Sequence, residues 1–174
     1  MDLNDSIAYA YKAAVPIDGY HLLIVNSTVY GTAGTAVGGT YALFTRDAAT
    51  SNNKMAASAL HETGHSIAKL SDEYVYAGGG NIYPLINKTY DLTNIPWKLW
   101  LEGLPLPTPD SYGLDSPRGT PPDSDHFWQR VGAYKQDIAT FYRPTYGSMM
   151  VNAGPGAEFG PVNSEAIILA IYAK

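Results

Sequence analysis

The sequence predicts a mixed α/β (α+β) fold in a single domain spanning residues 1–174. Two apolar segments, 21–26 and 40–45, have the length and the flanking turn residues of strands. Residues 54–70 and 163–174 instead have the length and composition of helices. A chain of 174 residues can bury one core, and no internal repeat or linker divides it. We therefore expect one domain.

The first half of the chain contains the expected strands. Residues 5–14 follow an Asn/Asp/Ser cluster and stop before a proline, which predicts a short helix. The continuous apolar run HLLIVN at 21–26 predicts a buried central strand, and TYALFT at 40–45 predicts a second strand. Gly, Pro, Asn and Asp are dense between 75 and 125, so we expect little regular structure there beyond a short helix over 96–103.

Capping residues mark the two long helices. TSNN at 50–53 precedes the Ala-rich helix expected over 54–70. The closing helix follows a turn-rich loop at 145–154, and its first residue types predict a cap at Asn163 or Ser164.

Composition excludes several functional classes. Lys and Arg total 11 against 16 Asp and Glu, a net charge of −5, and no basic run predicts binding to nucleic acid or to an anionic membrane. The absence of cysteine excludes disulfides and thiolate metal sites. The longest apolar run is too short to span a bilayer, and the first residues do not form a signal peptide.

The pentapeptide HETGH at 61–65 predicts a metal site. Residues four apart lie on one face of a helix, so His61 and His65 can bind one ion. Glu62 points about 100° round the helix, where it can act as general base on the attacking water. The alternative is an Ala-rich helix that carries two unrelated histidines.

The third ligand is expected shortly after this helix. In the metzincin pattern it lies ten residues after the first histidine, but that position is Ser71, a poor zinc ligand. Asp72 and Glu73 follow at once, whereas a thermolysin-like ligand would have to be Asp91 or Glu102, neither on a convincing second helix. We predict Asp72, with Glu73 as the alternative.

The segment HETGHSIAKLSDEY (61–74) resembles the H-E-x-G-H-x(4)-L-x-D-E-Y signature of the bacterial IgA-peptidase-type metallopeptidases, a metzincin-like family. The resemblance covers roughly residues 7–172. It continues in four further blocks in the family's order: DGYHLLIVNSTVYGTAG, NIPWKLWL, VGAYKQDIATFYRPTYGSMM and FGPVNSEAI.

This resemblance implies a metzincin-like zinc-peptidase catalytic domain that is extracellular or bound to the cell surface. It implies a Met-turn beneath the zinc ion, formed by Met150 or else by Met149, and a strand at 38–45 that pairs with extended substrate. The family's turning glycine is Ala68 here, and its Y-G-G-x-G-G loop is replaced by YGTAGTAVGG at 30–39.

Another departure concerns the start of the domain. The family's domain has N-terminal strands and a helix that would precede residue 5. We expect that an upstream segment or another chain completes that half of the fold, or that this is a minimal version.

The function expected from these residues is that of a zinc-dependent endopeptidase acting on a protein or peptide, with Glu62 as general base. The alternative is a non-catalytic zinc-binding structural or assembly protein on the same fold. Tyr74, Tyr142 and Tyr146 are near the site blocks in sequence, but none can be assigned as an oxyanion-stabilising residue.

Overall fold

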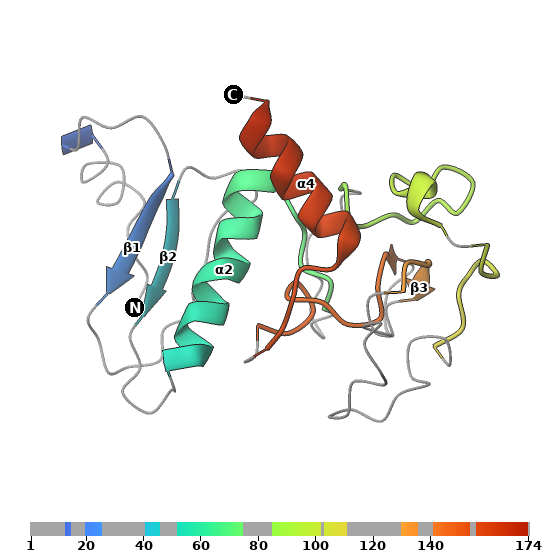
Figure 1. The fold of residues 1–174 in the computed structure, drawn as a ribbon, viewed down its shortest axis with the longest axis horizontal. Helices are drawn as coiled ribbons and strands as arrows, with labels where there is room; N and C mark the ends of the chain where they lie inside the picture. Colours follow the sequence, from blue (N-terminus) through green and yellow to red (C-terminus); the bar gives the residue numbers. More distant parts are fainter. Residues whose placement is uncertain are drawn as a thin grey trace.

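Four short strands, two long helices and a 3-10 helix, joined by loops, make up the described part of the chain (Figure 1). The computed structural model describes residues 13–14, 20–25, 41–45, 52–74, 85–101, 103–110, 130–135, 141–153 and 156–173. The elements in order are β1 (His21–Val25), β2 (Tyr41–Thr45), α2 (Asn52–Ala68), the 3-10 helix η1 (Lys98–Trp100), β3 (Tyr134–Lys135), β4 (Tyr142–Arg143) and α4 (Pro161–Tyr172). These elements are compatible with the predicted α+β class.

The two predicted strands form a parallel pair in which His21 lies opposite Tyr41 and Val25 opposite Thr45. The described side chains do not show the continuous burial expected of a central strand, because Leu22 is 50% exposed. Within the described residues β1 pairs with β2 alone, so both are edge strands of a two-stranded sheet. One lateral edge of β1 is therefore left without a neighbour in this part of the chain.

Helix α2 packs against β2 on one side and against α4 on the other (Figure 1). It begins and ends two residues earlier than expected. The helix stops because Lys69 adopts a left-handed conformation with φ +55°, and the N–H of Leu70 then donates to the carbonyl oxygen of Gly64 at 3.3 Å. No glycine is needed at position 68, because the left-handed residue is Lys69, one position after Ala68. The predicted third ligand, Asp72, likewise lies one position after Ser71.

Replacing Lys69 with glycine is expected to stabilise the protein by about 0.5–1 kcal/mol. A left-handed conformation costs a non-glycine residue about 1–2 kcal/mol, and glycine removes this cost. The greater conformational freedom of glycine in the unfolded chain offsets part of the gain. The urea-unfolding midpoint measures this change. Lys98→Gly is the matched control, because Lys98 is also exposed but has no positive φ. An unchanged or lower midpoint for Lys69→Gly would contradict the prediction.

The loop-rich part of the chain is held by a small apolar core. Its buried members are Ile95, Trp97, Val131, Ala133 and Val162. The indole N–H of Trp97 donates to the carbonyl oxygen of Gly132 at 2.7 Å, which ties η1 to the segment leading into β3. The short helix expected over 96–103 is confirmed only as the three residues of η1.

The final helix, α4, begins earlier than expected. Its N-terminal cap is Gly160, with Pro161 in the first turn, so the predicted cap at Asn163 or Ser164 is wrong. Asn163 is instead inside the helix with its side chain 1% exposed and hydrogen-bonded to Glu73. Proline suits the first turn because its missing N–H would have no helical partner there.

Some expectations lie outside the described residues. The helix expected over 5–14 is described only at Ala13–Ala14, which are helical, and the loop at 30–39 is not described. Among the residues that are described, no helix has the length and apolar character needed to cross a membrane.

Candidate metal centre

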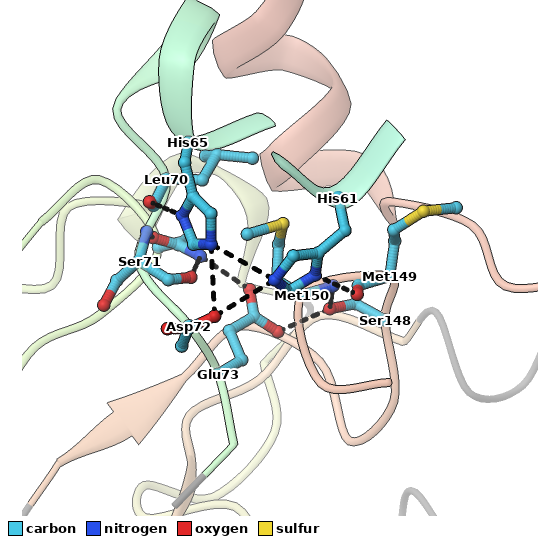
Figure 2. Close-up of polar contacts among 10 residues, drawn as sticks. His61, His65, Leu70, Ser71, Asp72, Glu73, Ser148, Met149 and Met150 are labelled. Atoms are coloured by element: carbon cyan, nitrogen blue, oxygen red, sulfur yellow. Dashed lines mark hydrogen bonds and ion pairs between the residues drawn. The ribbon is translucent and has the colours of Figure 1, made fainter. Parts of the chain in front are cut away.

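The first two residues of the site lie one turn apart on α2. His61 and His65 are 6% and 4% exposed, and their rings meet edge to face with centroids 4.7 Å apart. After the reversal at Lys69 the chain runs back beneath the helix and places Asp72 opposite both rings (Figure 2). The helix therefore determines the spacing of the two histidines, and the turn at Lys69 determines the position of the Asp72 carboxylate.

Three potential ligand atoms converge at this point. Asp72 Oδ1 lies 3.1 Å from His61 Nε2 and 3.2 Å from His65 Nε2, and the two Nε2 atoms are 3.1 Å apart. Ligand atoms about 2.0–2.1 Å from a tetrahedral ion would be about 3.4 Å from one another. The triangle is thus close to the size that holds a metal ion, and it needs only a small expansion to do so.

The other nitrogen of each ring is used for orientation. His61 Nδ1 is 2.9 Å from the carbonyl oxygen of Met149, and His65 Nδ1 is 2.7 Å from that of Leu70. A carbonyl oxygen only accepts hydrogen bonds, so each Nδ1 must carry the proton. In the neutral rings both Nε2 lone pairs then face the Asp72 carboxylate. Three acceptors pointed at one another repel unless a cation, a proton or a metal ion, lies between them.

The shifted pKa values of His65 and Asp72 also indicate that a cation is stabilised between these side chains. Burial alone would lower the pKa of His65, but its hydrogen bonds to Asp72 and to the Leu70 carbonyl raise it above the ordinary value. Burial opposes ionisation of Asp72, yet the hydrogen bonds from His61 and His65 hold the pKa of its carboxyl far below the usual range. The carboxylate is therefore ionised, and it draws positive charge into the triangle.

Zinc affinity is expected to rise with pH through the raised pKa of His65, because the ion binds the neutral ring and protons compete with it. In the metal-free protein the sign is opposite. Protonated His65 contributes stability that is fully present below its unfolded-state pKa of about 6.5 and is lost as pH rises through the higher folded-state pKa. Thermal unfolding with and without zinc should show a zinc-dependent gain that grows from about pH 6 to pH 8. A gain independent of pH would contradict this.

The alternative third ligand, Glu73, is bonded to Ser148 in Figure 2 and is not among the three converging residues. It is fully buried, and its Oε1 accepts hydrogen bonds from the side-chain amides of Asn87 at 2.9 Å and Asn163 at 2.8 Å. Its Oε2 accepts from the Ser148 hydroxyl at 2.7 Å. Burial raises the pKa of Glu73, although these hydrogen bonds offset part of the effect. The geometry therefore groups Asp72, and not Glu73, with the two histidines.

The residue expected to act as base lies beside the triangle. Glu62 is 6% exposed, and its negative charge contributes to the raised pKa of His65. The carboxylate therefore lies within electrostatic range of the group. Ser66, one turn later, donates its hydroxyl to the main-chain carbonyl of Glu62 at 3.2 Å.

Met150 fills the space below the helix between the two histidines. It is fully buried, and a Cβ atom at position 64 would lie 3.2 Å from its sulfur, 3.2 Å from Leu70 Cδ1 and 2.9 Å from Phe159 Cε1. The glycine of HETGH thus allows the methionine to approach the helix backbone. Met149, the other residue considered for this role, instead contributes its carbonyl oxygen to His61.

Gly64→Ala is expected to lower zinc affinity about tenfold, because the added methyl group displaces Leu70 and Met150. The carbonyl oxygen of Leu70 orients His65, and that of Met149, next to Met150, orients His61. Overpacking costs about 1–3 kcal/mol and the better helix propensity of alanine returns about 1 kcal/mol, so the folded state loses about 1 kcal/mol. A competitive zinc titration and urea unfolding measure the two effects. Gly147→Ala is the control, since a Cβ there would meet nothing within 4 Å; equal effects of the two variants would contradict the prediction.

Of the three tyrosines near the site blocks, Tyr74 is the one beside a predicted ligand. Its ring stacks on that of His61, with centroids 6.1 Å apart and an angle of 13° between the planes. Tyr146 lies against Tyr134 and beneath the Arg143 guanidinium, and Tyr142 pairs through its main chain with Thr89. No oxyanion-stabilising role is assigned to any of them.

Sequence reasoning missed the residues that orient the ligands. These are Asn87, Ser148 and Asn163, together with the carbonyl groups of Leu70 and Met149. Carbonyl groups carry no sequence signal, because every residue has one. Ser148 lies in a loop and Asn163 in α4, and only their spatial meeting at Glu73 reveals their role.

Comparison of the chain with models of known protein families produced no match, and neither did comparison with curated proteins.

Proposed function

We propose that this protein is a zinc-dependent endopeptidase. The observation that carries the proposal is the convergence of three acceptor atoms on His61, His65 and Asp72, with both histidine rings held in place by carbonyl groups at Nδ1. Two imidazoles and one carboxylate suit a borderline metal such as zinc. Within the described residues the group has three members, the number of protein ligands that a catalytic zinc site has, whereas a structural site has four.

A zinc ion held by His61, His65 and Asp72 would lower the pKa of a water molecule to about 7 and would polarise a peptide carbonyl group. The chain's own residues would do the rest. Glu62 takes the proton from the attacking water and passes it to the nitrogen of the leaving amine. His61 and His65 stay neutral at Nε2 because their protons are held at Nδ1 by carbonyl groups.

The choice of peptide bonds as substrate comes from the resemblance of the sequence to the IgA-peptidase-type family. Three of its signature residues, the two histidines and the aspartate that follows, converge in the site. The same resemblance favours an extracellular or cell-surface location.

The test is digestion of casein and of a mixed peptide library by the full chain, stripped with a chelator and then reloaded with one equivalent of zinc. We expect cleavage that disappears on stripping and returns on reloading. Tight zinc binding without cleavage of any substrate would overturn the peptidase proposal and would favour a non-catalytic zinc protein.

A further inference from the structure

A buried carboxylate next to the metal group has no role in the chemistry described above. Glu73 is fully buried and follows Asp72 directly in the chain. Both of its oxygens are taken up by hydrogen bonds from side chains, so neither is directed at the histidines. Burying a carboxylate is costly, and the structure satisfies it with donors from three separate segments. The use of three buried donors to satisfy one carboxylate indicates a role for Glu73 beyond packing.

The first connection runs from Glu73 to the chain that carries the third ligand. The amide of Asn87 donates both to Glu73 Oε1 at 2.9 Å and to the main-chain carbonyl of Ser71 at 2.9 Å, while its oxygen accepts the N–H of Ser71 at 2.8 Å. The residues on both sides of Asp72 are thus bound to one asparagine. Through this clamp the Asp72 backbone has little freedom to move away from the histidines.

The second connection runs from Glu73 to the turn beneath His61. Ser148 donates its hydroxyl to Glu73 Oε2 at 2.7 Å and accepts the N–H of Met150 at 3.0 Å. The main-chain N–H of Glu73 also donates to the Met150 carbonyl at 2.8 Å. Met149, between these two positions, supplies the carbonyl oxygen that orients His61. The position of that carbonyl therefore depends on the bonds that Glu73 makes.

Two further contacts secure Glu73 itself. Arg143 donates to its main-chain carbonyl at 2.7 Å, and Asn163 of α4 donates to Oε1 at 2.8 Å. These contacts bring β4 and α4 into the same network. Glu73 is consequently held by several elements of the fold.

We propose that Glu73 is a positioning residue for the metal centre, holding both the third ligand and the backbone that orients His61. The inference rests on metal binding in the proposed function, but it does not depend on hydrolysis. Residues that orient metal ligands from behind change affinity by about 10- to 100-fold when they are removed.

The test uses Co²⁺ as the probe, because its visible absorption responds to ligand number and geometry. Affinity and spectrum are measured for the full-length wild type, Glu73→Ala, Glu73→Gln and Ser148→Ala. We expect Glu73→Ala to bind about 10- to 100-fold more weakly with an altered spectrum. Glu73→Gln should return to within about threefold of wild type, because its amide can accept from both asparagines and donate to Ser148. Ser148→Ala should lose about tenfold by releasing the turn beneath His61.

A purely structural role is excluded by the control Thr108→Val. Thr108 is 2% exposed and accepts the N–H of Ala133 at 2.8 Å, far in the chain from the metal group, so its loss destabilises folding without touching the ligands. The proposal is overturned if Glu73→Ala keeps the wild-type affinity and spectrum, or loses no more than Thr108→Val. If Glu73→Ala does not fold, unchanged binding by Ser148→Ala overturns it. If the wild type itself binds no Co²⁺, the proposed metal site fails instead.

Discussion

Replacing Asp72 with asparagine is expected to lower zinc affinity by about 100- to 1,000-fold. The change keeps the size of the side chain but removes the negative charge that faces two imidazole nitrogens at 3.1 and 3.2 Å. A structural zinc site with four ligands binds with about 10–16 kcal/mol, or about 2.5–4 kcal/mol per ligand, which corresponds to a loss of about that size. Competition with a chromophoric chelator at pH 7.5 measures the affinity directly.

Glu73→Gln is the matched control for this experiment, since it makes the same chemical change one residue further along the chain. Its hydrogen bonds to Asn87, Asn163 and Ser148 can all be kept, so zinc affinity should stay close to that of the wild type. The reverse pattern, with affinity lost in Glu73→Gln and retained in Asp72→Asn, would show that Glu73 is the third ligand.

The second large effect is expected from Glu62→Gln, which should reduce peptide cleavage by about 100- to 10,000-fold, because an amide cannot accept the proton from the attacking water. Zinc should still bind at one equivalent with nearly unchanged affinity, since Glu62 is not among the three converging ligands. Cleavage of a fluorogenic peptide and zinc content, measured on the same preparation, separate the two outcomes.

Glu165→Gln provides the matched control, because Glu165 is exposed on α4 and contacts the Trp100 indole rather than the metal group. It should cleave at the wild-type rate. Wild-type cleavage by Glu62→Gln would show that another group takes the proton. Loss of zinc together with loss of cleavage would show that Glu62 maintains the site structurally.

The part of the site that could be predicted from sequence is the part formed by neighbours in the chain. The spacing of His61 and His65 is fixed by helix geometry, and counting beyond the helix was enough to prefer Asp72 over Glu73. The structure brings these three together. The zinc ion and the peptidase activity remain predictions.

The remainder of the site could not be predicted because it is formed by residues far apart in the chain. Glu73 meets Asn87, Ser148 and Asn163 from segments 14 to 90 residues away, and no local pattern encodes such a meeting. The helix cap was misplaced for a related reason. Asn163 has the side chain of a good cap, but the buried carboxylate of Glu73 uses it, and Gly160 begins the helix instead.

The main-chain hydrogen bonds to the two histidines have a consequence for how the centre tolerates mutation. Leu70 and Met149 orient the rings with carbonyl oxygens, atoms that every amino acid carries. A substitution at position 149 therefore leaves that hydrogen bond available, provided that the new side chain fits a site that is 3% exposed. Substitutions that leave the main chain in place are thus expected to preserve the orientation of the two rings. A saturation library at position 149 would retain many metal-binding members, whereas one at position 61 would retain few.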